Sequence, residues 1–335
     1  MALLTPNATY KINGVTVHEK IIPDGTRWQD ANKAKRAGFA AGDLYKKQQK
    51  LCGNGKPKSV TIHNTSDLAN VNDDGEQYTR ATYNENMGSA RVHFYVDNQC
   101  AWQNLKAGTG KCTADKTGAA EVSWHAGDGS LADGGNMTSI SIEIIMGDKT
   151  ASHDVAARDN GARLAAWLLY KHGLGINNLV THTYWVNHSA GKKFADVDDQ
   201  CTNLISGEKW CPLYIFGNTS VKSTALANWK AFKALVQKYL DALEGKDTEE
   251  SKPASSGVIY RVQVGAYSNI ENARATYNKV KAAGFDAIAV KVGTLYKIQI
   301  GAFSVHANAQ AMAKRAKAAG FEAFITTASG TMIVL

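Results

Sequence analysis

An internal repeat near the C-terminus constrains the fold of this 335-residue chain more than any other feature of its sequence. The segment YRVQVGAYSNIENARATYNKVKAAGFDAIAVK, which starts at Tyr260, is echoed by YKIQIGAFSVHANAQAMAKRAKAAGFEAFITT, which starts at Tyr296. Each copy shows alternating apolar residues, then a helical period, then AAGF and a second alternating run. Strand, helix and strand, taken twice, predict a β-α-β-β-α-β unit with a four-stranded sheet and two helices on one face.

A polar segment separates this repeat from the rest of the chain. EGKDTEESKPASSG, residues 244–257, is charged and rich in small residues, as interdomain linkers are. We therefore expect a first domain over residues 1–244, a linker over 245–257 and a repeat domain over 258–335.

Strand-like and helix-like stretches alternate in the first domain. KSVTIHNTS (58–66), ARVHFYVD (90–97) and SISIEIIM (139–146) have the composition of strands. VAARDNGARLAAWLLYKHG (155–173) has the apolar spacing of a long helix that stops at Gly173. This alternation predicts an α/β fold in which a mixed central sheet is flanked by helices.

Composition and charge limit the classes of function. An apolar content of 44% excludes wholesale disorder, and no apolar run approaches the roughly 18 residues of a membrane span. The net charge is +8, and residues 258–335 alone carry nine Lys/Arg against three Asp/Glu, a balance of +6. Such an excess favours a polyanionic partner, either nucleic acid or an anionic bacterial wall.

The cysteines and histidines offer a candidate metal site. The five cysteines form no CxxC pair, and disulfides are the minority expectation, although Cys100 and Cys112 could pair. His63 ends an apolar strand-like run, and His182 follows the run NNLVT. Together with Cys211, these histidines would supply three ligands and leave a fourth tetrahedral position for water.

Five motifs in the first domain resemble those of a known enzyme family. VTIHNTS, WHAGDG (124–129), SISIEI, VTH and SGEKWCP occur in the order found in zinc-dependent N-acetylmuramoyl-L-alanine amidases of type 2, over residues 58–216. That family includes phage endolysins and bacterial autolysins and shares its fold with peptidoglycan recognition proteins. The resemblance implies that His63, His182 and Cys211 hold Zn²⁺.

The same resemblance implies roles for three further residues. Glu143, in the strand SISIEII, corresponds to the acid/base residue of related endolysins, which moves a proton between water and the leaving amine. Lys209 lies two residues before Cys211 and would stabilise the oxyanion as a fixed positive charge. His125, in WHAGDG, would contact the substrate or support a ligand from behind.

The chain departs from the family pattern at several points. Val92 occupies the position of a catalytic tyrosine found in some relatives, which leaves Glu143 to act alone. The interval between the second histidine and the cysteine is longer than usual, and its insertion contains the rival ligands His188 and Cys201. SGEKWCP also has one residue more than the usual SGKxCP, so Lys209 matches the lysine of the family less directly than Cys211 matches its cysteine.

The repeat domain resembles a SPOR domain, a peptidoglycan-binding module, through RVQVGAYS and its echo KIQIGAFS. We expect Gln263, Gln299, Tyr267 and Phe303 to contact sugars from the exposed face of the sheet, with an interior place for the two rings as the alternative. An RRM domain has the same layout, but its basic-Gly-aromatic strand is missing, so nucleic acid is not an expected partner.

Together these features predict a zinc amidase that cuts the bond between N-acetylmuramic acid and L-alanine in peptidoglycan and so lyses the cell wall. The alternatives are a non-catalytic peptidoglycan-binding protein and an amidohydrolase that cuts another bond near the lactyl group. The start MALLTPNATYKINGVTVHEK lacks the layout of a signal peptide. We therefore expect synthesis in the cytoplasm and action on the wall after release, either by a phage or in mother-cell lysis.

Overall fold

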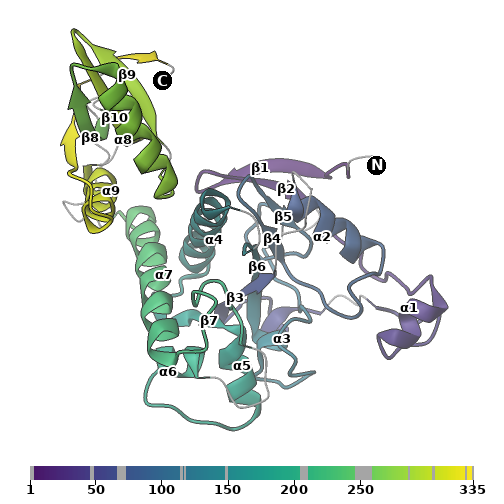
Figure 1. Cartoon of the computed structure of the whole chain (residues 1–335). Coiled ribbons are helices and arrows are strands. Elements are labelled where there is room, and N and C mark those ends of the chain that lie inside the picture. Colours follow the sequence, from purple (N-terminus) through teal and green to yellow (C-terminus); the bar gives the residue numbers. More distant parts are fainter. Residues whose placement is uncertain are drawn as a thin grey trace. The chain divides into compact units, whose positions relative to one another are not determined.

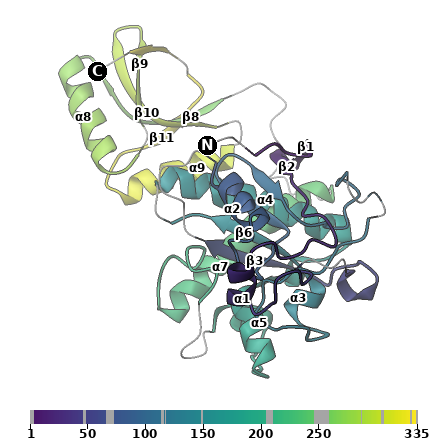
Figure 2. The same cartoon turned by 90° about the vertical axis from the view of Figure 1, so that its right-hand side faces the viewer.

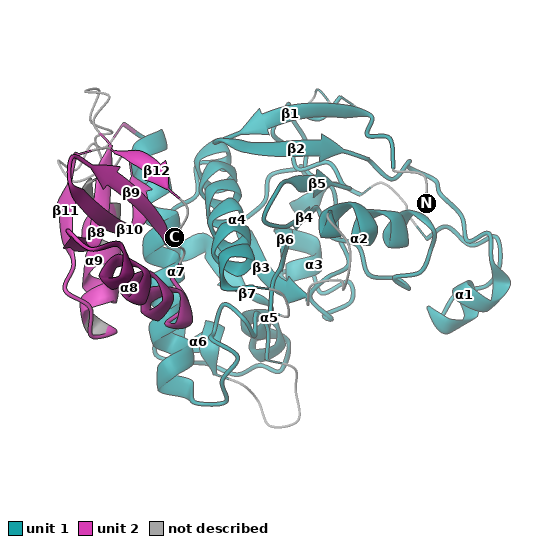
Figure 3. Ribbon diagram, turned by 45° about the horizontal axis from the view of Figure 1, so that its top comes forward, with its two compact units in different colours: residues 1–244 teal, residues 245–335 magenta. Residues whose placement is uncertain are grey.

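The computed structural model of the protein describes residues 4–45, 49–65, 73–113, 116, 118–147, 150–203, 210–245, 259–285, 287–303, 306–328 and 330–333. The chain forms two compact units, Met1–Glu244 (unit 1) and Gly245–Leu335 (unit 2), which Figure 3 shows in teal and magenta. Each unit has its own sheet and its own hydrophobic core. Apart from Gly245, the predicted linker lies outside the described residues.

Unit 1 is built on a seven-stranded mixed sheet with the strand order β1-β2-β5-β4-β6-β3-β7 (Figure 1). The strands are β1 (Ala8–Ile12), β2 (Val15–Glu19), β3 (Ser59–Thr65), β4 (Phe94–Val96), β5 (Ala101–Gln103), β6 (Ser139–Ile145) and β7 (Leu179–Thr181). Strands β4, β6, β3 and β7 run parallel to one another, whereas the pairs β1–β2 and β4–β5 are antiparallel. The predicted mixed sheet is therefore confirmed.

Helices flank this sheet, as Figures 1 and 2 show. The described helices of unit 1 are α1 (Ala31–Arg36), which lies apart from the sheet in Figure 1, α2 (Asp74–Tyr83), α3 (Gly135–Thr138), α4 (Ala151–His172), α5 (His182–Ser189), α6 (Val197–Thr202) and α7 (Lys222–Leu243), with short 3-10 turns η1 (Leu51–Gly53) and η2 (Ile176–Asn178). Helix α4 lies directly on the sheet, because Gly161 has no side chain and a Cβ there would overlap Ile144. It ends at Gly173, whose φ of 63° is the left-handed conformation that glycine adopts readily.

The alternation of residues along β6 gives the sheet two unlike faces. Ile140, Ile142 and Ile144 are fully buried in the core of unit 1, which also includes residues of α4. Ser141 and Glu143 alternate with these isoleucines and so project from the opposite face. The apolar residues therefore hold the sheet to α4, and polar residues are left on the other face.

Unit 2 contains a five-stranded antiparallel sheet with the strand order β11-β8-β10-β9-β12. Its elements are β8 (Tyr260–Tyr267), α8 (Ile270–Ala282), β9 (Ile288–Val292), β10 (Leu295–Phe303), α9 (His306–Ala318), β11 (Phe324–Thr326) and β12 (Thr331–Ile333). The predicted order of strands and helices is confirmed, but the predicted number of four strands is wrong. The fifth strand, β12, lies beyond the second repeat, so the repeat pattern could not reveal it.

Among the described helices of both units, none is long and apolar enough to cross a membrane.

Candidate metal centre

Three parallel strands bring a row of polar residues together on the polar face of the unit 1 sheet. In the strand register, His63 of β3 lies beside Glu143 of β6, and Glu143 lies beside Tyr95 of β4. Residues that share a register position on neighbouring parallel strands project from the same face. The row therefore places an imidazole, a carboxylate and a phenol next to one another.

Buried hydroxyl groups lie next to this row, two residues earlier on the same strands. Ser141, two residues before Glu143, lies 3.1 Å from His93 Nδ1, and its Oγ accepts a hydrogen bond from the His93 amide. Thr61, two residues before His63, accepts a bond of 2.7 Å from Trp185 Nε1. Because the alternating serine and threonine residues find partners, this face can be both polar and buried.

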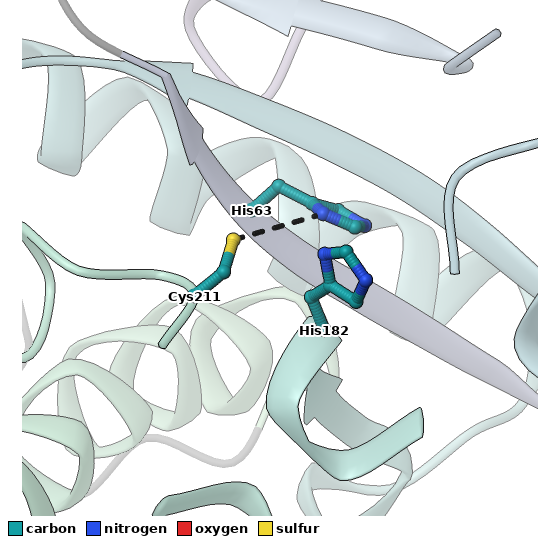
Figure 4. Close-up of side chains that lie close together, drawn as sticks. All are labelled: His63, His182 and Cys211. Atoms are coloured by element: carbon teal, nitrogen blue, oxygen red, sulfur yellow. Dashed lines mark hydrogen bonds between the residues drawn. The ribbon is translucent and has the colours of Figure 1, made fainter. Parts of the chain in front are cut away.

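His63, His182 and Cys211 converge, as the sequence predicted (Figure 4). His63 projects from β3, His182 is the first residue of α5 directly after β7, and Cys211 precedes α7. One potential ligand atom from each residue lies within 4.8 Å of the other two. The distance from Cys211 Sγ to His63 Nδ1 is 3.8 Å, and the two imidazole centroids are 4.9 Å apart.

These distances suit one tetrahedral metal ion. With metal–sulfur and metal–nitrogen bonds of about 2.3 and 2.0–2.1 Å, the sulfur and nitrogen of a tetrahedral site lie about 3.6 Å apart. The observed 3.8 Å is close to that separation. A thiolate with two imidazoles also suits a divalent transition metal better than it suits Mg²⁺ or Ca²⁺, which bind oxygen ligands. The three residues can therefore hold such an ion.

His125 determines which nitrogen of His63 can bind an ion. His125 Nε2 lies 3.1 Å from Gly135 O, and a carbonyl oxygen only accepts, so Nε2 carries the hydrogen. Burial, with His93 and His182 nearby, holds the pKa of His125 well below its usual value, so the ring is neutral. Its Nδ1 therefore accepts from His63 Nε2 at 2.9 Å. When the His63 ring is neutral, its hydrogen is therefore on Nε2, and Nδ1 is the nitrogen that can coordinate a metal ion.

Glu143 lies at the edge of this cluster. Its Oε2 is 4.0 Å from His63 Nδ1, and its side chain is 21% exposed, against 4% for that of His63. The carboxylate is thus beside the candidate ligands and still reaches solvent. In this position it can exchange a proton with a water molecule held next to the three ligands.

Two positions near Glu143 show what the sequence did and did not reveal. Val92, where some relatives have a tyrosine, is 5% exposed and packs in a small apolar cluster with Tyr95 and Ile145. Tyr95, which the sequence reasoning missed, stands in the row next to Glu143, and its hydroxyl lies 3.0 Å from that of Thr82. Burial raises the pKa of Tyr95, and Glu143 adds to this effect. The register of β4 on β6 places Tyr95 beside Glu143, and the sequence motifs alone do not show that register.

Lys209 lies outside the described residues, so its predicted role stays a prediction. The rival ligands His188 and Cys201 are not part of the cluster of His63, His182 and Cys211. His188 Nε2 instead lies 3.1 Å from Asp133 Oδ2, and Cys201 is fully buried on α6.

A second group of potential ligands, Asp73, Asp97 and Cys100, is occupied by structural hydrogen bonds. Asp73 accepts bonds from Trp102 Nε1 and from the backbone of α2. Asp97 accepts bonds from the backbone of Gly75 and Cys100. Burial also raises the pKa of the Cys100 thiol, which disfavours the thiolate that binds metals. Cys100 forms no disulfide with Cys112, and none joins any other pair of the five cysteines.

In unit 2, the expectation that Gln263 and Gln299 lie on an exposed face is wrong. These cross-strand partners are each 2% exposed. Within the described part of the chain, Gln263 Oε1 and Gln299 Nε2 have no hydrogen-bond partner.

The rings of Tyr267 and Phe303 are half-buried against the core of unit 2. Thr276 of α8 donates a bond of 2.7 Å to the Tyr267 hydroxyl, so this ring faces the helix. The register shifts by one residue between Gln263 and Gly265, which reverses the alternation along β8. The prediction that Gln263 and Tyr267 share one face assumed an uninterrupted alternation of side chains along the strand.

Comparisons with known proteins match both parts of the chain. Residues 53–213 match the family model for N-acetylmuramoyl-L-alanine amidase, and residues 256–327 match the model for the SPOR domain. No curated protein matches the chain.

Solved structures also resemble parts of the chain. The catalytic domain of XlyA is 24% identical, with 66% of this chain and 98% of that chain covered and a TM-score of 0.40. A mutant endolysin from Bacillus subtilis is also 24% identical, with 66% of this chain and 99% of that chain covered and a TM-score of 0.40. The peptidoglycan-binding domain of the B. subtilis cell wall lytic enzyme CwlC is 45% identical, with 22% of this chain and 95% of that chain covered and a TM-score of 0.21.

Proposed function

Since this chain carries an N-acetylmuramoyl-L-alanine amidase domain at residues 53–213 and a SPOR domain at residues 256–327, we propose that it is a zinc-dependent enzyme that lyses bacterial cell walls. Its substrate is peptidoglycan, and the bond cut is the amide between N-acetylmuramic acid and L-alanine. The observation that carries this proposal is the convergence of His63, His182 and Cys211 beside the carboxylate of Glu143.

Metal binding and proton transfer are assigned to different residues in this proposal. His63, His182 and Cys211 would hold the zinc ion, which when bound polarises the scissile carbonyl and acidifies water. Glu143 takes a proton from the attacking water and returns it to the amine of L-alanine as that amine leaves. The distance of 4.0 Å between its Oε2 and His63 Nδ1 supports this role, because it sets the carboxylate beside a candidate ligand.

Lys209 completes the proposed machinery. If the chain is extended there, the spacing of two residues between Lys209 and Cys211 would put both side chains on the same side. A fixed ammonium there would stabilise the negative charge that develops on the carbonyl oxygen in the transition state.

The substrate also sets the proposed place of action. Peptidoglycan lies outside the cytoplasmic membrane, so the enzyme acts on the wall after it leaves the cytoplasm. Unit 2, with its excess of positive charge, would hold the enzyme on the anionic wall at low ionic strength. Fractionation of producing cells before and after lysis tests this step, because the protein should move to the wall fraction only on lysis.

Mass spectrometry of purified walls digested with the protein tests the reaction. Free stem peptides that begin with L-alanine are the expected product. Fragments cut at another bond near the lactyl group would instead indicate a different amidohydrolase. Intact walls to which a zinc-loaded protein is bound would indicate the non-catalytic alternative, and Cys211 within the cluster argues against that outcome.

A further inference from the structure

The residue that follows each candidate histidine ligand binds the chain around the candidate cysteine ligand. Thr183 follows His182 and contacts Cys211 itself, whereas Asn64 follows His63 and contacts Ile215. In the sequence, Cys211 is 28 residues from Thr183. Two polar side chains thus connect all three ligand-bearing segments.

Thr183 holds the backbone of Cys211 by three hydrogen bonds. The Thr183 amide and hydroxyl both donate to Cys211 O, at 3.0 and 2.9 Å. The Cys211 amide in turn donates to Thr183 Oγ1 at 3.1 Å. One hydroxyl therefore donates to the carbonyl and accepts from the amide of the same residue, because a hydroxyl group is both a donor and an acceptor. Thr183 is fully buried, so water does not compete for these bonds.

Asn64 makes the corresponding connection from β3. Its Oδ1 accepts a bond of 2.8 Å from the Ile215 amide, and its Nδ2 donates a bond of 2.8 Å to Ile144 O. Ile144 directly follows Glu143, so Asn64 ties the cysteine segment to the strand that carries the candidate base. Asn64 is 6% exposed.

We propose that Thr183 and Asn64 are positioning residues that set the affinity of the metal centre. Neither side chain is placed among the ligands, and both act through the backbone of the segment that carries Cys211. Without them the thiolate would have to be ordered when the ion binds, and that cost would appear as weaker binding. This inference rests on the proposed zinc function, because it concerns how the ion is held.

Zinc affinity of the full-length protein, measured by competition with a chromogenic chelator, tests the proposal. Thr183→Val keeps the shape of the side chain but removes the hydroxyl, and it should weaken zinc binding by roughly 10- to 100-fold, as loss of a supporting partner does in other metal sites. Thr183→Ser keeps the hydroxyl and should bind zinc like the unmodified protein. Asn64→Leu keeps a similar side-chain size but can no longer accept from Ile215 or donate to Ile144, and it should give an intermediate loss.

Thr79→Val is the matched control. Thr79 of α2 is also fully buried, and its hydroxyl accepts a bond of 2.9 Å from Asn104 Nδ2. Neither residue belongs to the cluster of His63, His182 and Cys211. Thermal unfolding of the metal-free proteins should show that Thr79→Val and Thr183→Val are both destabilised, while zinc affinity should fall only in Thr183→Val. A merely structural role for Thr183 would instead leave the zinc affinity of both folded variants unchanged.

The outcomes separate this inference from the proposed function. If the unmodified protein binds no zinc, the proposed function fails. If it binds zinc and Thr183→Val binds it equally well, the proposed function stands and the positioning role is refuted. Should Thr183→Val not fold, Asn64→Leu decides the question, since equal zinc affinity in that variant would also overturn the proposal.

Discussion

Unit 1 assembles its candidate site from three segments that differ in sequence and structure, whereas unit 2 contains one pattern twice. A strand, a helix start and a loop supply His63, His182 and Cys211, and each of these residues offers one potential ligand atom. In unit 2, by contrast, Gln263 of the first copy pairs directly with Gln299 of the second. The comparison teaches that unit 1 brings unlike side chains to one site, whereas unit 2 places like side chains at equivalent positions of its two halves.

Removal of one ligand from unit 1 should give the largest effect. Cys211→Ser should lose bound zinc and reduce amidase activity by roughly 10³-fold or more, because several kcal/mol of transition-state stabilisation depend on the metal. Zinc content by atomic emission and peptide release from walls measure the two effects. Cys201→Ser is the control, since Cys201 is equally buried but lies outside the cluster. Equal zinc content in both variants would remove Cys211 from the ligand set.

Replacement of the candidate base should separate chemistry from metal binding within unit 1. Glu143→Gln keeps the size of the side chain but cannot accept a proton, so activity should fall by about 10²- to 10⁴-fold. Zinc content should stay unchanged, because Glu143 is not one of the three clustered ligands. Full activity in this variant would show that another group moves the proton.

Matched changes in unit 2 test whether its two halves are equivalent. Lys281 and Lys317 hold corresponding positions in the repeats, and both are exposed near the ends of α8 and α9. Lys281→Gln and Lys317→Gln should each weaken wall binding by up to about fivefold at low salt, the range of a single exposed charge interaction. Co-sedimentation with walls at two salt concentrations measures this, and the differences should vanish at high salt. A large loss in only one variant would contradict the equivalence.

The smallest predicted effect is a dependence of unit 1 stability on pH. Burial lowers the pKa of His172, whose Nε2 donates to Ala107 O at 2.9 Å. The unfolded chain therefore gains a proton near pH 6.5 while the folded chain does not, so the free energy of unfolding falls as the pH drops below about 6.5. Thermal unfolding at pH 7.5 and 5.5 measures this loss, and His172→Gln should reduce it. An unchanged pH dependence in His172→Gln would exclude this histidine as its source.

The sequence predicted the parts of the fold and site that depend on alternation and on element ends. The isoleucines of β6 and the stop at Gly173 follow from local patterns, and His63 and His182 lie at or near the ends of parallel strands, where side chains from distant segments meet. The motif order then pointed to Cys211. Tyr95 was missed because only the register of β4 on β6 brings it next to Glu143.

The predictions for unit 2 failed where a β-bulge interrupts the period of two. An inserted residue changes which face the following side chains occupy, and nothing in the alternation of RVQVGAYS marks that position. Gln263 and Tyr267 were therefore assigned to one exposed face, although Gln263 is buried and Tyr267 contacts α8. Strand β12 was missed for another reason, since it lies beyond the end of the second copy of the repeat.

The hydroxyl of Thr183 has a consequence for how this enzyme can vary. Because Thr183 bonds to the backbone of Cys211, the thiol is held beside His182 although Thr183 and Cys211 are 28 residues apart in the sequence. A protein engineer who alters the segment between them to suit another bacterial wall should therefore keep Thr183, and also the buried Cys201, whose carbonyl accepts a bond from Thr181.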